Sequence, residues 1–136
     1  MDELRILVCG GREYNNTKKV YEILDFIKSI ADISIDTPAP DGSIIKIPQH
    51  KLIIIQGGAK GADKLASKWA KDRNVEQEEY PANWAAYGKS AGYIRNQLML
   101  ISGKPDIVIA FPGNKGTKMM IELSRKANVP VEIIED

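Results

Sequence analysis

Cysteine and histidine are almost absent from this sequence, since each occurs once, as Cys9 and His50. A single cysteine cannot form an intrachain disulfide, which favours a reducing cytoplasm. One cysteine and one histidine also leave little for a metal site or a histidine-activated nucleophile. We therefore expect no metal and no cofactor, and we interpret Cys9 as a buried small hydrophobe.

Long apolar runs and an excess of one charge are lacking as well. No stretch approaches the ~20 apolar residues of a membrane-spanning helix, and the acidic start Met1-Asp2-Glu3 is unlike a signal peptide. The net charge is only +1, from 19 Lys and Arg against 18 Asp and Glu. We expect no membrane partner, and nucleic acid is disfavoured as a partner because its binders usually carry a basic excess. A local basic pocket is compatible with this charge.

Short apolar runs rich in Ile and Val, each followed by a glycine-rich turn, are what the sequence has instead. The runs cover residues 4–8, 52–55 and 106–110, and the turns cover residues 9–12, 56–63 and 111–117. Such runs are typical of strands buried on both faces in a parallel sheet. A glycine-rich turn that leads into a helix brings backbone N–H groups together around an anion. Each turn also carries a cation, Arg12, Lys60 or Lys115, so the pattern predicts a phosphorylated ligand.

Apolar residues at helical spacing predict helices that alternate with these strands. The helices are expected over residues 17–30, 61–73, 90–101 and 116–127, and further strands over 75–80, at a sheet edge, and 131–134. The alternation predicts an α/β fold with helices on both faces of the sheet. In the third helix, Ala91, Ile94, Leu98 and Ile101 are expected to point inward. In the fourth, the residues expected to be buried are Met119, Met120, Leu123 and Ala127.

Residues 31–50 interrupt this alternation, and their turn signals predict an inserted hairpin. The insertion is interpreted either as a lid or oligomer contact, or as a surface excursion that the fold tolerates. With 136 residues, 43% of them hydrophobic, the chain is expected to form one domain over residues 1–136.

Several candidate residues have two interpretations. Asp63 suits a ribose-hydroxyl acceptor or a carboxylate that favours the helix dipole, and Thr117 suits a phosphate donor or a helix cap. Trp84 suits a stacking platform for a base or a core plug. The candidate ligand-binding residues are Gly10, Gly11, Arg12, Gly57, Gly58, Ala59, Lys60, Gly61, Asp63, Asn83, Trp84, Lys89, Arg95, Asn96, Pro112, Gly113, Asn114, Lys115, Gly116 and Thr117. The turns match neither the dinucleotide fingerprint nor the P-loop.

The order of these motifs resembles the YspA/YpsA-related branch of the SLOG superfamily. The resemblance is carried by Gly10-Gly11-Arg12-x-Tyr14, residues 57–63, residues 80–84, Tyr87-Gly88-Lys89-x-Ala91-Gly92, Arg95-Asn96-x-x-Met99 and Ala110-Phe111-Pro112-Gly113-x-x-Gly116-Thr117. It covers nearly the whole chain except the insertion. It implies a three-layer Rossmann-like fold with a mostly parallel five-stranded sheet of order 3-2-1-4-5. It also implies a nucleotide or ADP-ribose-like ligand over the strand C-termini, and a homodimer or higher homo-oligomer.

One departure from the related LOG phosphoribohydrolases bears on activity. Their pattern P-G-G-x-G-T-x-x-E supplies a glutamate for cleaving a nucleoside monophosphate, whereas this chain has Asn114 at the second glycine and Met120 at the glutamate. An oxocarbenium-like transition state needs a nearby carboxylate. The leading hypothesis is therefore a ligand-binding sensor, carrier or sequestering module. The alternatives are a LOG-type phosphoribohydrolase in which Asp63 supplies the carboxylate, and single-stranded DNA binding of the DNA-processing type.

Overall fold

Five strands form the central sheet of the computed structural model, which describes residues 2–33, 35–47 and 49–136. They are β1 (Glu3–Cys9), β4 (Lys51–Gln56), β5 (Glu76–Glu79), β6 (Ile107–Ala110) and β7 (Val131–Ile133). The order is β5-β4-β1-β6-β7, and each neighbouring pair runs parallel. When only these five strands are numbered along the chain, the order is 3-2-1-4-5, so the expected Rossmann-like α/β fold is confirmed.

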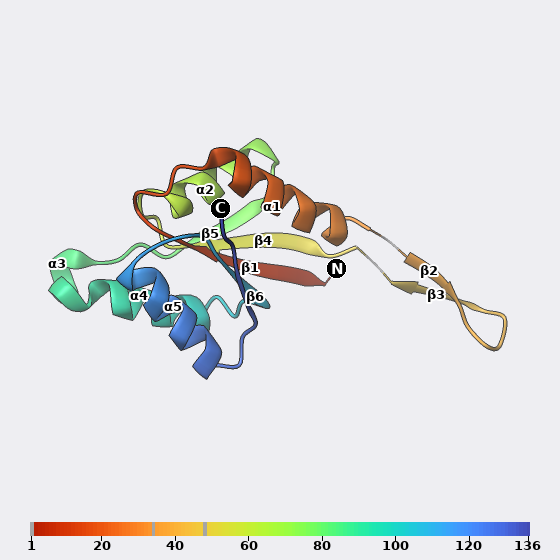
Figure 1. Cartoon of the computed structure of the whole chain (residues 1–136). Helices are drawn as coiled ribbons and strands as arrows, with labels where there is room; N and C mark the ends of the chain where they lie inside the picture. Colours follow the sequence, from red (N-terminus) through yellow and green to blue (C-terminus); the bar gives the residue numbers. More distant parts are fainter. Residues whose placement is uncertain (1, 34, 48) are drawn as a thin grey trace.

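Helices cover both faces of this sheet (Figure 1). On one face lie α1 (Thr17–Ala31) and α2 (Ala62–Asp72), and on the other lie α4 (Ala91–Ile101) and α5 (Lys115–Lys126). The short helix α3 (Trp84–Tyr87) and a 3-10 turn, η1 (Gly88–Ser90), lead into α4. Within the described residues no helix combines the length and the apolar character needed to cross a membrane.

The alternation of side chains along β1 divides the core into two clusters. Ile6 and Val8 pack with α1 and α2, whereas Leu7 and Cys9 pack with residues of α4 and α5. This follows from the period of two in a strand, which sends successive side chains to opposite faces. The sheet is therefore buried on both sides at its centre, while β5 is a short charged edge strand, as predicted.

The turns and caps account for where the helices begin. The Oδ1 atom of Asn16 accepts a hydrogen bond from the Lys19 amide at 3.0 Å, the geometry of a helix N-cap, and α1 starts at the next residue. Gly61 precedes α2 with φ +78°, and a Cβ there would overlap the carbonyl of Gly11. The first and second glycine turns thus touch where α2 begins.

The inward face of α4 differs from the expectation. The buried residues of this helix are Ala91, Asn96 and Met99, while Leu98 and Ile101 are exposed. The expectation wrongly assumed that the most apolar stripe faces the sheet, whereas a partly polar stripe does so. Ala127, also expected to be buried, is exposed at the C-terminal end of α5.

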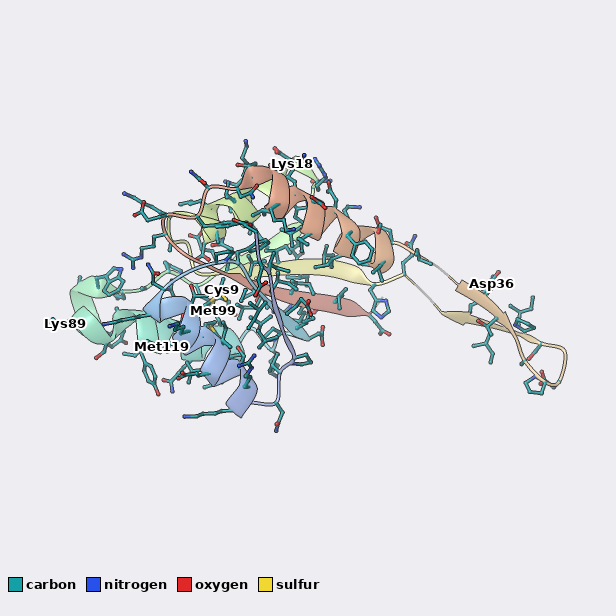
Figure 2. The ribbon with its side chains drawn as sticks, in the orientation of Figure 1. Cys9, Lys18, Asp36, Lys89, Met99 and Met119 are labelled. Carbon is teal, nitrogen blue, oxygen red and sulfur yellow. The ribbon has the colours of Figure 1, made fainter. Side chains whose placement is uncertain are left out.

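The predicted insertion is a two-stranded antiparallel hairpin, formed by β2 (Ile35–Pro38) and β3 (Ile44–Ile47). It projects away from the body (Figure 1), and its base is fastened where the His50 amide donates to the Ala31 carbonyl at 2.9 Å. Because it joins the end of α1 to the start of β4, it leaves from the edge where the parallel strands begin. The glycine turns lie at the opposite edge of the sheet, so within one chain the hairpin does not cover them. In Figure 2, Asp36 lies in the hairpin at one end of the molecule, and Lys89 lies at the opposite end.

Candidate functional site

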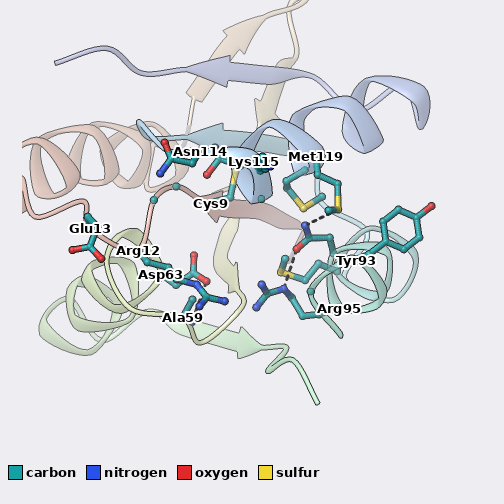
Figure 3. Close-up of a pocket in the computed structure, with 18 of the residues that line it drawn as sticks. Cys9, Arg12, Glu13, Ala59, Asp63, Tyr93, Arg95, Asn114, Lys115 and Met119 are labelled. Carbon is teal, nitrogen blue, oxygen red and sulfur yellow. Dashed lines mark hydrogen bonds between the residues drawn. The ribbon is translucent and has the colours of Figure 1, made fainter. Parts of the chain in front are cut away.

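A cavity of about 600 Å³ opens beyond the C-terminal ends of β1 and β6 (Figure 3). Its walls come from the first glycine turn, from α3 and α4, and from the start of α5. A second cavity of about 390 Å³ adjoins it and reaches the second glycine turn. The carboxyl ends of the strands in an open α/β sheet are the usual place for a ligand.

Most of the sequence-predicted residues come together here. Gly10, Gly11, Arg12, Ala59, Asp63, Trp84, Lys89, Arg95, Asn96, Asn114, Lys115, Gly116 and Thr117 line the larger cavity, and Gly57, Gly58 and Lys60 line the smaller one. The two cavities share Arg12, Glu13, Ala59, Trp84 and Arg95. Their lining therefore forms a single bipartite site.

Four candidate residues lie outside both linings and shape the turns instead. The Pro112 carbonyl accepts the Gly11 amide at 2.8 Å, which joins the first and third turns. Gly113 leaves room for the Thr117 hydroxyl. Gly61 passes close to Gly11, and Asn83 caps α3 by accepting the Ala86 amide at 3.0 Å.

Three amides of the second turn, those of Gly57, Gly58 and Ala59, are already occupied by side chains of the protein. The Oδ2 atom of Asp63 accepts from the Gly57 and Ala59 amides at 3.2 Å each, and Gln56 Oε1 accepts from the Gly58 amide at 2.6 Å. This differs from the expectation of free amides in this turn. A carboxylate of the chain itself sits in the position that an anion would otherwise take.

The third turn is open. Asn114 precedes α5 but makes no side-chain cap bond, and no acceptor is recorded within the described residues for the amides of Lys115, Gly116 and Thr117. The first N–H groups of a helix carry a partial positive charge. Together with the Lys115 ammonium and the Thr117 hydroxyl, these amides make the start of α5 a favourable place for a phosphate.

Asp63 is the buried carboxyl of the site. Its side chain lines the cavity and is 6% exposed, and burial raises its pKa from 3.8 to about 6, although hydrogen bonds from Ala59 and Gly57 and the charge of Arg95 favour the ionised form. A carboxyl that titrates near neutrality suits proton transfer as well as hydroxyl binding.

Arg95 connects α4 to the second turn. Its Nη1 donates to the Gly57 carbonyl at 2.7 Å and its Nε donates to Asn96 Oδ1 at 2.9 Å. Burial lowers the pKa of the guanidinium, an effect that Asp63 partly opposes. These bonds hold the cation in the wall shared by the two cavities.

Trp84 stands at the boundary of the two cavities. The guanidinium of Arg12 lies 5.5 Å from the centre of its ring, within the range of a cation–π contact. Half of the Trp84 surface is exposed, so the core-plug interpretation is wrong. A large aromatic face beside a cation is available for stacking.

Sequence reasoning missed the sulfur-containing residues of the cavity. Cys9, Met99, Met119 and Met120 all line it, although the sequence assigned Met119 and Met120 only to the core. Burial raises the pKa of the Cys9 thiol to about 12, so it remains uncharged. Among the described residues, no three His, Cys, Asp or Glu side chains are grouped as a metal site.

Comparisons with known proteins agree with this architecture. Residues 43–87 match the model of the YspA, cpYpsA-related SLOG family. The Gene 61 protein of Mycobacterium phage D29 is 31% identical over 134 residues, which cover 93% of each chain.

Solved structures share the fold. The molybdenum cofactor binding protein from Rippkaea orientalis is similar with a TM-score of 0.68 at 21% identity, over 100% of this chain and 78% of that one. The X-ray structure of TM1055 is similar with a TM-score of 0.63 at 15% identity, over 94% of this chain and 72% of that one. DNA processing protein A from Streptococcus pneumoniae is similar with a TM-score of 0.62 at 15% identity, over 98% of this chain and 51% of that one. By its sequence relatives and its fold, the chain belongs to the YspA, cpYpsA-related SLOG family.

Proposed function

We propose that this protein binds a nucleotide or a nucleotide-derived phosphorylated molecule, such as an ADP-ribose-like or cyclic ligand, in the bipartite cavity. The observation that carries this proposal is the open start of α5, where Lys115, Thr117 and three amides without an acceptor among the described residues border the cavity. A phosphate held there is stabilised by charge-assisted hydrogen bonds.

The rest of the cavity suits the remainder of a nucleotide. Arg12 and Lys89 add positive charge, and the exposed face of Trp84 offers stacking area. Asp63 supplies an acceptor for a ribose hydroxyl. The molybdenum cofactor binding protein with the same fold is named for binding a small molecule, which supports a binding role. We propose that the protein acts as a sensor, carrier or sequestering module, and that it works as a homo-oligomer.

Titration calorimetry tests this proposal with nucleoside monophosphates, nucleoside diphosphates, ADP-ribose, cyclic nucleotides and ribose 5-phosphate. We expect at least one to bind, and Lys115→Ala to weaken it about tenfold, the loss expected from one charge-assisted hydrogen bond. Lys126→Ala is the matched control, because Lys126 lies at the other end of the same helix. The proposal fails if no phosphorylated compound binds at millimolar concentration, or if the two variants behave alike.

A second candidate, an N-glycosidase of the phosphoribohydrolase type, is favoured by the burial and raised pKa of Asp63. This carboxyl is suited to activating a water that attacks the anomeric carbon, or to stabilising positive charge on the ribose. Chromatography of nucleoside monophosphates incubated with the protein should then show free base. Asp63→Asn separates the roles, since a general base loses turnover whereas a ribose ligand mainly loses affinity.

A further inference from the structure

One wall of the larger cavity combines a buried amide with soft sulfur atoms. Asn96 from α4 lies beside Met99 from the same helix, Met119 and Met120 from α5, and Cys9 from the end of β1, and all five residues line the cavity. Figure 3 shows Met119 and Cys9 in this wall. We call these five residues the sulfur recess. It is separate from the charged start of α5 and carries no formal charge.

The orientation of the Asn96 amide is fixed by Arg95. The Nε–H of Arg95 donates at 2.9 Å to one end of the amide, which must therefore be the carbonyl oxygen. The NH2 end then points to the sulfur recess, where its recorded partner is the Met119 thioether at 3.7 Å. A thioether is a weak acceptor, and Asn96 is 95% buried, at 5% exposure. The amide thus presents a donor that the protein itself satisfies poorly.

We propose that the sulfur recess receives the base of the ligand and that the Asn96 NH2 group donates to an acceptor on the base edge, either a ring nitrogen or a carbonyl oxygen. This inference rests on the proposed function, because it assumes a nucleotide in the cavity. Thioether and thiol groups make favourable contacts with aromatic rings and adapt to their shape. A buried donor with a poor partner gains most from an acceptor brought by the ligand.

The position of the recess relative to α5 agrees with one nucleotide in both subsites. Thr117 is at the open start of α5 and Met120 is three residues further along, a rise of about 4.5 Å along the helix axis. A ribose spans a gap of this size, with its phosphate at the amides and its base in the recess. In this arrangement Asn96 is a specificity-determining residue for the base and does not contact the phosphate.

Calorimetry with matched ligands tests the proposal. The four nucleoside monophosphates AMP, GMP, CMP and UMP are compared with ribose 5-phosphate, which lacks the base. We expect at least one nucleotide to bind more than tenfold tighter than ribose 5-phosphate, and Asn96→Ala to reduce that advantage about five- to tenfold, as for a lost buried hydrogen bond. The affinity for ribose 5-phosphate should fall by less than that for the nucleotide, because Asn96 donates to the base and the variant affects a phosphate only through the lost bond to Arg95. Gln97→Ala is the control, because this neighbouring amide is not among the described residues that line the cavity, although it donates to the hydroxyl of Tyr93, which does line it.

The possible outcomes distinguish a failure of this inference from a failure of the proposed function. If ribose 5-phosphate binds but no nucleotide binds tighter, or if Asn96→Ala weakens all ligands equally, the assignment of the base to the recess is overturned and phosphate binding stands. If nothing phosphorylated binds, both are overturned. Should Asn96→Ala fail to fold, NMR of the unaltered protein decides. The Asn96 side-chain amide resonance should then shift with the tightest nucleotide and stay unchanged with ribose 5-phosphate, and the reverse refutes the proposal.

Discussion

The Nη1 atom of Arg95 donates to the carbonyl oxygen of Gly57 at 2.7 Å, and there is no room beside that nitrogen for a side chain on Gly57. A Cβ at residue 57 would overlap the guanidinium and would approach the Asp63 carboxylate to 3.0 Å. An alanine at this position would therefore have to displace the Arg95 guanidinium, through which α4 fastens the second turn.

From this contact we predict that Gly57→Ala displaces Arg95 and weakens nucleotide binding about tenfold, with a loss of stability of about 1–3 kcal/mol from overpacking. Calorimetry and thermal unfolding measure the two effects. Gly116→Ala is the stability control, since among the described residues no atom beyond its chain neighbours and its own helix backbone lies within 4 Å of a Cβ at that position, and α5 gains helix propensity. Equal melting temperatures and affinities for Gly57→Ala and the unaltered protein would contradict the prediction.

The raised pKa of Asp63 predicts a particular pH dependence of stability. Between pH 3.8 and about 6 the folded protein binds a proton at Asp63 that the unfolded chain has released. The contribution of this residue to the free energy of unfolding therefore falls as the pH rises through that window, in total on the order of 3 kcal/mol. Other carboxyls titrate in the same range, so the measurement must isolate Asp63.

Comparison with Asp63→Asn isolates it, because an asparagine can still accept the Gly57 and Ala59 amides but does not titrate. We expect the stability of the unaltered protein, relative to this variant, to decrease from pH 4 to pH 7 in urea unfolding experiments. Parallel stability curves for the two proteins would show that the carboxyl titrates normally.

Trp84 is predicted to report ligand binding by its fluorescence. The chain has two tryptophans, of which Trp69 is fully buried and bonded to Asp25 at 2.8 Å, while Trp84 is half exposed at the cavity. A nucleotide that stacks on Trp84 or displaces Arg12 from its face changes the emission of that ring alone. We expect AMP or ADP-ribose at saturation to alter the spectrum of the unaltered protein, and Trp84→Phe to abolish the change. An undiminished change in Trp84→Phe would place the effect elsewhere.

Much of this arrangement follows from local patterns in the sequence. The Ile- and Val-rich runs specified β1, β4 and β6, and glycines directly after them located the turns, because both signals depend on neighbouring residues. Since carboxyl ends of parallel strands share one edge, the turns had to converge. The candidate residues of the cavity could therefore be named before any contact was known.

The predictions were wrong where contacts between residues distant in the sequence determine which side chains face inward and which amides are occupied. In α4 the stripe of Ile94, Leu98 and Ile101 is the more apolar one. The stripe that contains Asn96 and Met99 nevertheless faces inward, where Met99 packs in the core and both residues line the cavity. The occupied amides of the second turn depend on Gln56 and Asp63 side chains that bend back toward the turn. Glycine spacing carries no information on such side-chain bonds, which compete for the same donors that an anion would use.

The position of the hairpin predicts that it is dispensable for ligand binding. Its strands β2 and β3 form a sheet of their own, and the Ala31–His50 bond holds the two ends of the insertion together. Replacing residues 35–47 by a short Gly-Ser linker should therefore leave the nucleotide affinity within about twofold, since a surface loop closed at its base costs little to alter. A tenfold loss would favour the lid interpretation.

Light scattering on the same variant tests the other interpretation of the hairpin, an oligomer contact. Ile44 and Ile45 are exposed on the hairpin and would be available for such a contact. If the hairpin is an oligomer contact, the measured mass falls toward that of one chain while binding persists, whereas an unchanged mass leaves the insertion as a tolerated excursion.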